Sequence, residues 1–189
     1  ESQLTDRLEV AVSAARQAGQ LTLEYFQRED LQVERKDDKS PVTAADRQAE
    51  QLLRKRVKDA FPEDGILGEE FGEESGTSGF RWILDPIDGT ISFISGVPLY
   101  GTLVGVEHER DGVIGVICIP ALGECIYAAR GGGAWYLKGD SRPCPATVSH
   151  RDRLGDAVFL TSQIDSFRAR GAEDAYLALE NAARVTRTW

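Results

Sequence analysis

The stretch WILDPIDGT, at residues 82–90, contains the strongest structural signal in this sequence. Its apolar start predicts a buried strand, and Pro86 then interrupts the strand because proline has no amide hydrogen to donate to a neighbour. We expect the chain to turn there, so that Asp85 and Asp88 face one point from either side of the turn. The carbonyl of Ile87 lies between them and is free to point inward.

This group of oxygens has the chemistry of a hard-cation site. Two carboxylates and a carbonyl suit magnesium or manganese and are poor ligands for zinc. Gly89 and Thr90 follow at once, and backbone amides there can approach an anion, above all if a helix begins at that point. A cation site beside an anion site is the arrangement that phosphoryl hydrolysis needs. The alternative interpretation is a plain turn without chemistry.

The distribution of charge supports a cation site. The 189 residues carry a net charge of −9, and residues 59–90 alone hold nine acids and a single base, Arg81. Crowded carboxylates repel one another unless protons or a cation intervene, which favours a divalent metal over the alternative of a solvated acidic loop. Glu69 and Glu70 belong to this stretch, although such a pair is often plain surface. No comparable basic stripe exists, so a nucleic-acid groove is disfavoured.

Apolar spacing and turn residues predict the elements that precede this stretch. They indicate two amphipathic helices separated by a loop or short hairpin, then a short strand and an acidic, glycine-rich loop. Thr43 and Asp46 form a capping-box pattern at the start of the second helix. The expected ranges are Leu4 to about Arg28, 33–43, about 45–60, 65–70 and 71–79.

After the stretch, alternating residues predict a meander of strands, with a turn at Asp111–Gly112. The expected strands are 99–107, 112–119, 123–129 and 133–137, and beyond Pro143 we expect a further strand at 156–162 and a helix at 172–184. We therefore expect an N-terminal α+β domain at 1–142 that carries the metal site. Residues 143–189 would begin a smaller C-terminal α/β domain.

Several classes of protein are disfavoured. No run of eighteen apolar residues exists, and the N-terminus lacks the basic and apolar pattern of a secretory signal. Neither a phosphate-binding loop for nucleoside triphosphates nor a serine nucleophile elbow is present. The odd number of cysteines favours reduced thiols and a cytoplasmic protein. Because residue 1 is Glu and methionine is absent, we expect the written chain to lack its true start, which leaves a removed targeting segment open.

Three motifs in order carry a family resemblance. WILDPIDGT, preceded by ILGEE at 66–70 and SPVTAAD at 40–46, resembles the inositol monophosphatase family of magnesium-dependent, lithium-sensitive phosphatases. SFISGVPLYGTLVGV at 92–106 and RVTRTW at 184–189 look most like its histidinol-phosphate phosphatase branch. The resemblance implies a layered αβαβα sandwich of the type shared with fructose-1,6-bisphosphatase. It also implies that the chain is truncated at its C-terminus, since the family continues with a Trp-Asp motif that ligates metal.

The resemblance also implies roles for individual residues. Glu69, Asp85, Asp88 and the carbonyl of Ile87 would bind metal, and Thr90 would orient the attacking water. Glu69 would contribute to catalysis by binding the catalytic metal, and Asp46 would support the same water or a weakly held ion. The substrate phosphate would lie against the backbone of Ile87, Asp88, Gly89 and Thr90. Two or three Mg²⁺ ions are expected, with Mn²⁺ as a substitute.

The function that follows is hydrolysis of a phosphomonoester, with histidinol phosphate from histidine biosynthesis as the expected substrate. Inositol monophosphate, or another sugar or nucleotide phosphate, is the alternative within the class, and a non-catalytic divalent-metal module is the alternative outside it. We expect a small phosphorylated metabolite as the binding partner, a homodimer, and neither nucleic acid nor membrane. Ile91 differs from the branch, where a basic or polar residue is more usual.

Overall fold

The computed structural model describes residues 2–36, 40–162 and 164–188. The chain forms two compact units, residues 1–146 and residues 147–189. Residues 37–39 of the expected loop or hairpin, and Trp189 of the closing motif, lie outside the described residues. Within the described ranges, no helix is both long and apolar enough to cross a lipid bilayer.

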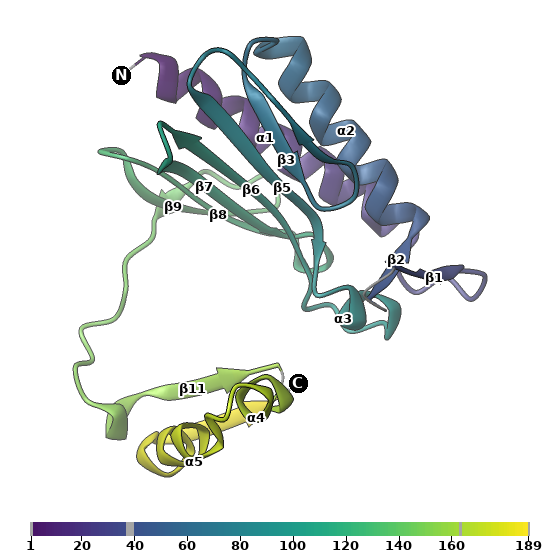
Figure 1. The fold of residues 1–189 in the computed structure, drawn as a ribbon. Coiled ribbons are helices and arrows are strands. Elements are labelled where there is room, and N and C mark those ends of the chain that lie inside the picture. The colour runs from purple at the N-terminus through teal and green to yellow at the C-terminus, as the bar shows by residue number, and fades with distance from the viewer. Residues whose placement is uncertain (1, 37–39, 163, 189) are drawn as a thin grey trace. The chain divides into compact units, whose positions relative to one another are not determined.

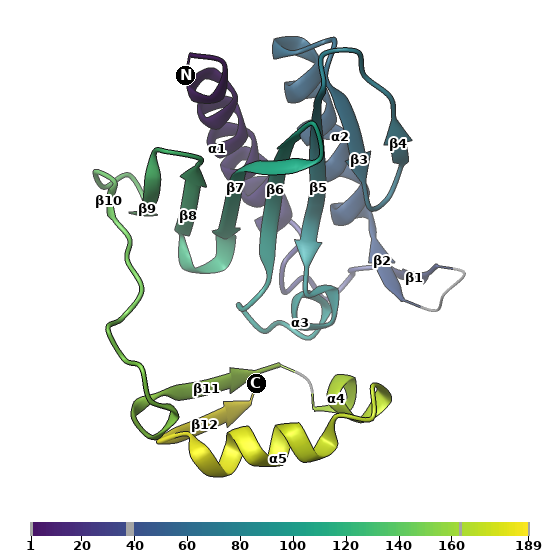
Figure 2. The ribbon, with the colours of Figure 1, turned by 60° about the vertical axis from the view of Figure 1, so that its left-hand side comes forward.

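The first unit consists of two helices packed on one face of an eight-stranded sheet (Figures 1 and 2). The helices are α1 (Ser2–Leu23) and α2 (Ala44–Ala60). The buried face of α1 is largely alanine, and these small side chains let the helix lie close to α2 and to the sheet. In spatial order the strands are β10 (Cys144–Pro145), β9 (Gly133–Lys138), β8 (Glu124–Ala129), β7 (Asp111–Ile119), β6 (Gly101–His108), β5 (Phe80–Asp88), β3 (Gly65–Gly68) and β4 (Gly72–Glu74).

One parallel strand pair sits inside this sheet. β3 and β5 run in the same direction, with Gly68 opposite Leu84, whereas the other pairs between described strands of the sheet are antiparallel. The carboxyl ends of parallel neighbours meet at the same edge of a sheet. The next residues along the two strands, Glu69 and Asp85, are therefore brought side by side.

A buried carboxylate joins α1 to the sheet. Asp64, just before β3, accepts hydrogen bonds from Nε and Nη2 of Arg7, each at 2.8 Å, from the Trp82 indole at 2.8 Å and from the Ser78 hydroxyl at 2.6 Å. Burial alone would raise the pKa of Asp64, but the hydrogen bonds from Arg7, Ser78 and Trp82 outweigh it and hold the pKa below its usual value. This cluster fixes where β3 begins.

The structure corrects three predictions in the first unit. The first helix ends at Leu23 and not near Arg28, because the later apolar residues, such as Phe26, pack into a separate cluster around Phe93 and Tyr100. The acidic loop after residue 70 contains β4. The hairpin between β6 and β7 turns at Glu109–Arg110, both in the left-handed region, and not at Asp111–Gly112.

Of the two alternatives for residues 33–43, the short hairpin is present, formed by β1 (Val33–Arg35) and β2 (Pro41–Thr43). The remaining strands of the meander lie within two residues of their expected bounds. β10 pairs with β9 and so joins residues 144–145 to the first unit. The expected domain boundary at 142/143 falls before this pairing.

The second unit is a small β-α-β arrangement. β11 (Val158–Thr161) and β12 (Val185–Thr188) pair in parallel, and α4 (Asp165–Ala169) and α5 (Glu173–Ala182) connect them. Tyr176 of α5 packs against the rings of Phe159 and Phe167. The expected strand and helix are present, and the helix ends at Ala182 because the chain must extend into β12.

Candidate active site at the end of the parallel strands

The acidic residues of the central motif lie where β3 and β5 end. The backbone amide of Glu69 donates to the carbonyl of Leu84 at 3.3 Å, which extends the parallel ladder by one residue. The sequence predicts that Pro86 interrupts the strand, but β5 continues beyond it to Asp88. The strand bulges between Asp85 and Asp88, where the register against β6 shifts, and then continues. The bulge accommodates the missing amide of proline.

Asp85 is the carboxyl group whose pKa the neighbouring acids change most. Its Oδ1 is buried and has no hydrogen-bond partner among the residues that the structure describes. Burial, together with the negative charges of Glu69 and Asp88, raises the pKa of Asp85 to about 7. Glu69 and Asp88 are therefore close enough to Asp85 to act on it electrostatically. A proton or a cation is needed to stabilise such a group.

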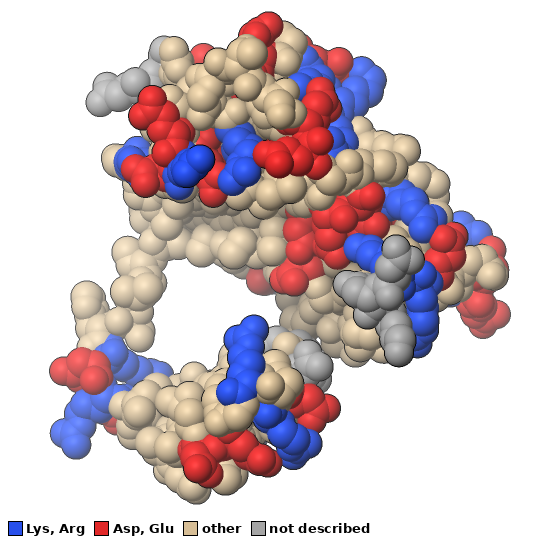
Figure 3. All heavy atoms as spheres, in the orientation of Figure 1, with Lys and Arg blue, Asp and Glu red and all other residues tan. Residues whose placement is uncertain are grey.

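Lys36 supplies a positive charge to the neighbouring pair. Its ammonium group donates to Glu69 at 2.8 Å and to Glu70 at 2.7 Å. Burial would lower the pKa of Lys36, but these two hydrogen bonds outweigh it and raise the pKa. On the face of the first unit that Figure 3 presents, Asp and Glu side chains gather beside Lys and Arg side chains. Lys36 is not among the predicted site residues, because it lies in a polar segment far along the chain from the acids.

Glu50 holds the turn that carries Glu69 and Glu70. Its carboxylate is completely buried in α2 and accepts the amide of Glu70 at 2.6 Å, the amide of Phe71 at 3.2 Å and Nε of Arg54 at 2.8 Å. A Cβ on Gly68 would lie 1.9 Å from Oε1 of Glu50, so the turn can approach this carboxylate only because residue 68 is glycine.

Glu50 is also absent from the predicted site residues. The signal was its position four residues after Asp46, which places both side chains on one face of α2. Only the fold reveals that this face meets the turn after β3.

Asp46 combines two structural tasks. It is buried near the start of α2 and accepts the Thr43 amide at 2.7 Å and the Thr43 hydroxyl at 2.6 Å, which confirms the expected capping box. Burial raises the pKa of Asp46, and the charge of Glu69 contributes in the same direction. Asp46 is thus electrostatically coupled to the acids of the site while it caps the helix.

The backbone after Asp88 lies on the other side of the candidate site. Gly89 has a φ of +85°, a conformation that favours glycine, and it begins the short helix α3 (Thr90–Ile94). The hydroxyl of Thr90 donates to the carbonyl of Ile87 at 3.2 Å, which uses one of the two lone pairs of that oxygen. The hydroxyl of Thr102 donates to the carbonyl of Pro86 at 2.9 Å and secures the bulge.

The donor set fits a hard divalent cation in its chemistry. Carboxylate oxygens, one of them an unpartnered buried atom on Asp85, are the ligands that magnesium prefers. Within the described part of the chain, no three Asp, Glu, His or Cys side chains converge closely enough to hold an ion as they stand. The ammonium of Lys36 occupies one side of the Glu69–Glu70 pair instead.

Comparison with known proteins decides the family. A model of the inositol monophosphatase family matches residues 3–187. The chain belongs to this family. A histidinol-phosphatase from Chlorobaculum parvum is 53% identical over 132 residues, covering 70% of this chain and 51% of that protein. Another from Streptomyces coelicolor is 36% identical over 188 residues, covering 97% of this chain and 70% of that protein. The chain thus spans about half the length of the first relative.

Solved structures agree on the fold. The IMPase of Thermotoga maritima has a TM-score of 0.81 at 32% identity, covering 97% of this chain and 68% of that chain. The suhB protein of Bartonella henselae has a TM-score of 0.80 at 31% identity, covering 95% of this chain and 69% of that chain. The expected family and the α/β fold class of the inositol monophosphatase type are confirmed. The roles expected of individual site residues stay predictions.

Proposed function

We propose that this protein is a magnesium-dependent phosphomonoester hydrolase whose substrate is histidinol phosphate. The observation that supports the proposal is the electrostatic coupling of Asp85 to Glu69 and Asp88 at the end of the β3–β5 pair, where the buried Oδ1 of Asp85 has no hydrogen-bond partner in the described part of the chain. The substrate assignment rests on the curated relatives, whose names are histidinol-phosphatase at 53% and 36% identity.

In this proposal Glu69, Asp85, Asp88 and the carbonyl of Ile87 hold the metal. Bound magnesium lowers the pKa of water and neutralises charge on the phosphate, in a set of two or three ions that Mn²⁺ can replace. Lys36 neutralises Glu69 and Glu70 when they bind no metal.

The chain's other groups position the reactants. The Thr90 hydroxyl, 3.2 Å from the Ile87 carbonyl, lies at the wall of the site and would orient the water, with Asp46 as a second acceptor. The phosphate lies against the backbone from Ile87 to Thr90, where Gly89 offers no side chain to obstruct it.

Asp88→Asn in the full-length protein tests the metal-site assignment. Asp88 is exposed, so the exchange preserves size and fold while it removes one charge from the site. We expect turnover to fall at least about a hundredfold, the scale of losing one well-placed transition-state contact. Asp6→Asn, at an exposed position of α1, is the matched control and should leave turnover unchanged. Near wild-type turnover of Asp88→Asn at saturating magnesium would refute the assignment.

A panel of phosphate esters tests the substrate. Inositol monophosphate is the second candidate, because an inositol-1-monophosphatase from Rhizobium meliloti is 40% identical over 156 residues. A preference for histidinol phosphate of more than about tenfold in kcat/KM, roughly 1.4 kcal/mol in transition-state binding, would support the assignment. The reverse preference would favour inositol phosphate. Metal binding without release of phosphate from any ester would indicate a non-catalytic module.

We also propose a homodimer in the cytoplasm. The family resemblance supports the dimer, and three free cysteines support a reducing compartment. Light scattering of the purified full-length protein, at concentrations spanning the micromolar range, would separate a dimer from a monomer.

A further inference from the structure

Two cysteines lie directly opposite each other on neighbouring strands. Cys118 of β7 pairs with Cys125 of β8 in the antiparallel register. Further along the same ladder, the amide of Arg130 donates to the carbonyl of Val113, which identifies that pair as hydrogen-bonded. Hydrogen-bonded and non-hydrogen-bonded pairs alternate, so Cys118 and Cys125 form a non-hydrogen-bonded pair. The Cα atoms of such pairs are only about 4.5 Å apart and their side chains are close.

This spacing allows a disulfide without movement of the strands. Disulfides join Cα atoms that are roughly 4.4–6.8 Å apart, so the pair lies at the short end of the permitted range. The two residues are 3% and 4% exposed. Because residues directly opposite each other in an antiparallel pair point to the same face, both side chains lie on one face of the sheet.

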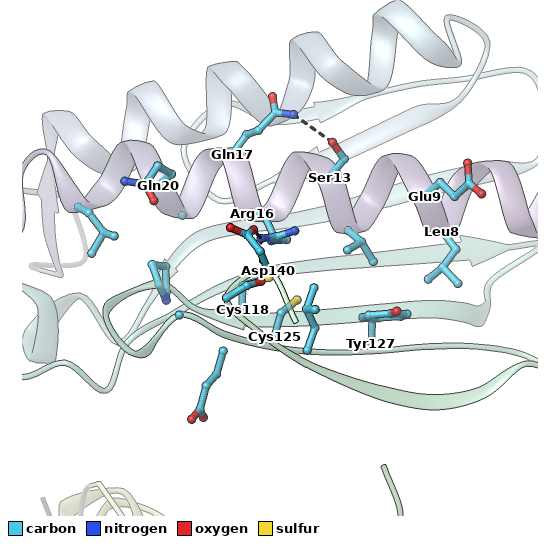
Figure 4. Close-up of a pocket in the computed structure, with 18 of the residues that line it drawn as sticks. Leu8, Glu9, Ser13, Arg16, Gln17, Gln20, Cys118, Cys125, Tyr127 and Asp140 are labelled. Carbon is cyan, nitrogen blue, oxygen red and sulfur yellow. Dashed lines mark hydrogen bonds and ion pairs between the residues drawn. The ribbon is translucent and has the colours of Figure 1, made fainter. Parts of the chain in front are cut away.

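A pocket reaches the two thiols from outside. It has a volume of about 830 Å³ and lies between α1 and the strands β7, β8 and β9 of the first unit, and Cys118 and Cys125 are part of its lining (Figure 4). Arg16 of α1 lies beside them, with its guanidinium bonded to the Gly139 carbonyl at 3.0 Å and to Asp140 at 3.1 Å. Both cysteines are therefore buried in the fold and line this pocket.

The environment distinguishes the two sulfur atoms. The hydrogen bond from Cys118 lowers the pKa of Cys125 and outweighs burial, which would raise it, and the positive charge of Arg16 contributes to the lowering. The same hydrogen bond, together with burial, raises the pKa of Cys118. Because the thiolate is the nucleophile in exchange reactions, Cys125 is the thiol that reacts first.

We propose that Cys118 and Cys125 are a modification site, at which a low-molecular-weight disulfide such as glutathione disulfide enters the pocket and oxidises them reversibly to a cross-strand disulfide. The thiolate of Cys125 attacks one sulfur of glutathione disulfide, which forms a mixed disulfide and releases one glutathione thiolate. Cys118 then loses its proton and attacks the Cys125 sulfur, which releases the second glutathione. The two protein thiols lose two electrons and two protons, and glutathione disulfide gains both to become two thiols.

Cys144 provides an internal comparison. It is exposed on β10 and its partner across the ladder is Tyr136, not a cysteine. With no second thiol opposite it, Cys144 should stop at the mixed disulfide with glutathione. The same reagent in the same tube therefore distinguishes general thiol reactivity from formation of the disulfide.

The wild-type protein permits the first test without any substitution. Arg110 and Arg130 flank both cysteines with no Lys or Arg between them, so trypsin leaves Cys118 and Cys125 in one peptide, residues 111–130. Folded protein is incubated with glutathione disulfide, blocked with a thiol reagent and digested. We expect this peptide to lose two hydrogen masses, without a glutathione adduct or blocking group, and to recover after dithiothreitol. Free thiols in the peptide, under conditions that modify Cys144, would overturn the proposal.

Two further measurements define the mechanism. In the Cys144→Ser background, Cys118→Ser should stop at a glutathione adduct on Cys125, since the second step lacks its nucleophile. Circular dichroism checks that this variant is folded, and the wild-type peptide result stands if it is not. Oxidation of wild-type protein that occurs in urea, but not in buffer, would show that only the unfolded chain reacts and would also overturn the proposal.

Discussion

Asp85 shows how position alone changes the chemistry of a carboxyl group. The residue follows Leu84 in a buried strand, where its Oδ1 is removed from water without a hydrogen-bond partner in the described part of the chain. Burial together with Glu69 and Asp88 raises the pKa of Asp85 to about 7, against an ordinary value near 3.9. Near neutral pH, the metal-free protein therefore holds a proton on a group that is normally ionised.

This proton predicts a pH dependence of stability. Between about pH 4 and pH 7 the folded protein binds the Asp85 proton while the unfolded chain releases it, so the free energy of unfolding should fall as pH rises through that window. Asp85→Asn removes this contribution and should flatten the slope. Urea unfolding across the window, with chelator present, measures it, and Asp6→Asn is the control. Parallel curves for Asp85→Asn and wild type would contradict the raised pKa.

At the scale of elements, α2 positions the turn after β3 through a single side chain. Glu50→Gln keeps the shape but replaces the acceptor of three hydrogen bonds by a neutral amide, one half of which is itself a donor. We expect the magnesium concentration for half-maximal activity to rise by about tenfold or more, the usual effect of losing a residue that orients ligands. Turnover at saturating magnesium should change less.

The control for this variant is Glu9→Gln, at an exposed position of α1. A purely structural role for Glu50 would lower the melting temperature and leave the magnesium dependence unchanged, which would contradict the positioning role. If no phosphatase activity exists in the wild type, the proposed function fails before this comparison begins.

Asp64, which bonds Arg7 of α1 and Trp82 of β5, is a second feature at the scale of elements, and its loss should measurably lower the free energy of unfolding. Asp64→Asn would leave the buried guanidinium of Arg7 without its counter-charge. Breaking one side of a buried ion pair typically costs about 3–5 kcal/mol in the free energy of unfolding. Asp59→Asn removes an exposed pair with Lys55 in α2 and should cost less than about 1 kcal/mol. Equal effects of the two substitutions in urea unfolding would show that Asp64 does not act as a buried hub.

Local sequence patterns predicted the elements and part of the site. Thr43 and Asp46 carry the capping box in four adjacent residues, and alternating strands with glycine turns are equally local. Short elements such as β4 and α4 hold too few residues for a period to be visible. The parallel pairing of β3 with β5, and the contact of Glu50 with the turn, join residues that are far apart in the chain.

The Asp-Pro-Ile-Asp motif nevertheless predicted part of the site, although contacts between distant residues could not be predicted. The spacing of Asp85 and Asp88 indicated a shared site, which the electrostatic coupling between them supports. Lys36 and Glu50 were missed, because a charged residue in a polar loop or a helix carries no local mark of the partner it meets after folding.

At the scale of the whole molecule, the two units differ greatly in their cores. The buried hydrophobic residues of the described chain belong to residues 1–146, apart from Tyr176 in the second unit. A segment of about 40 residues with so small a core is too short to fold alone without disulfides, metals or partners. The stability of the chain should therefore reside in the first unit.

Two fragments test this division. Residues 1–146 should fold and melt cooperatively, whereas residues 147–189 should give the circular dichroism spectrum of an unfolded chain. A cooperative thermal transition of residues 147–189 alone would contradict the expectation, as would a molten spectrum for residues 1–146. The full chain is the reference for both melts.

The contact of Glu50 with the amides of Glu70 and Phe71 has a consequence for entropy. Phe71 is 46% exposed, so the turn lies at the surface, yet two of its amides bond to a carboxylate that no water reaches. Ordering a free loop around a ligand costs roughly 1–2 kcal/mol per residue in backbone entropy. Here that ordering has already taken place during folding, so a ligand that meets Glu69 and Glu70 finds a rigid backbone and retains more of its contact energy as affinity.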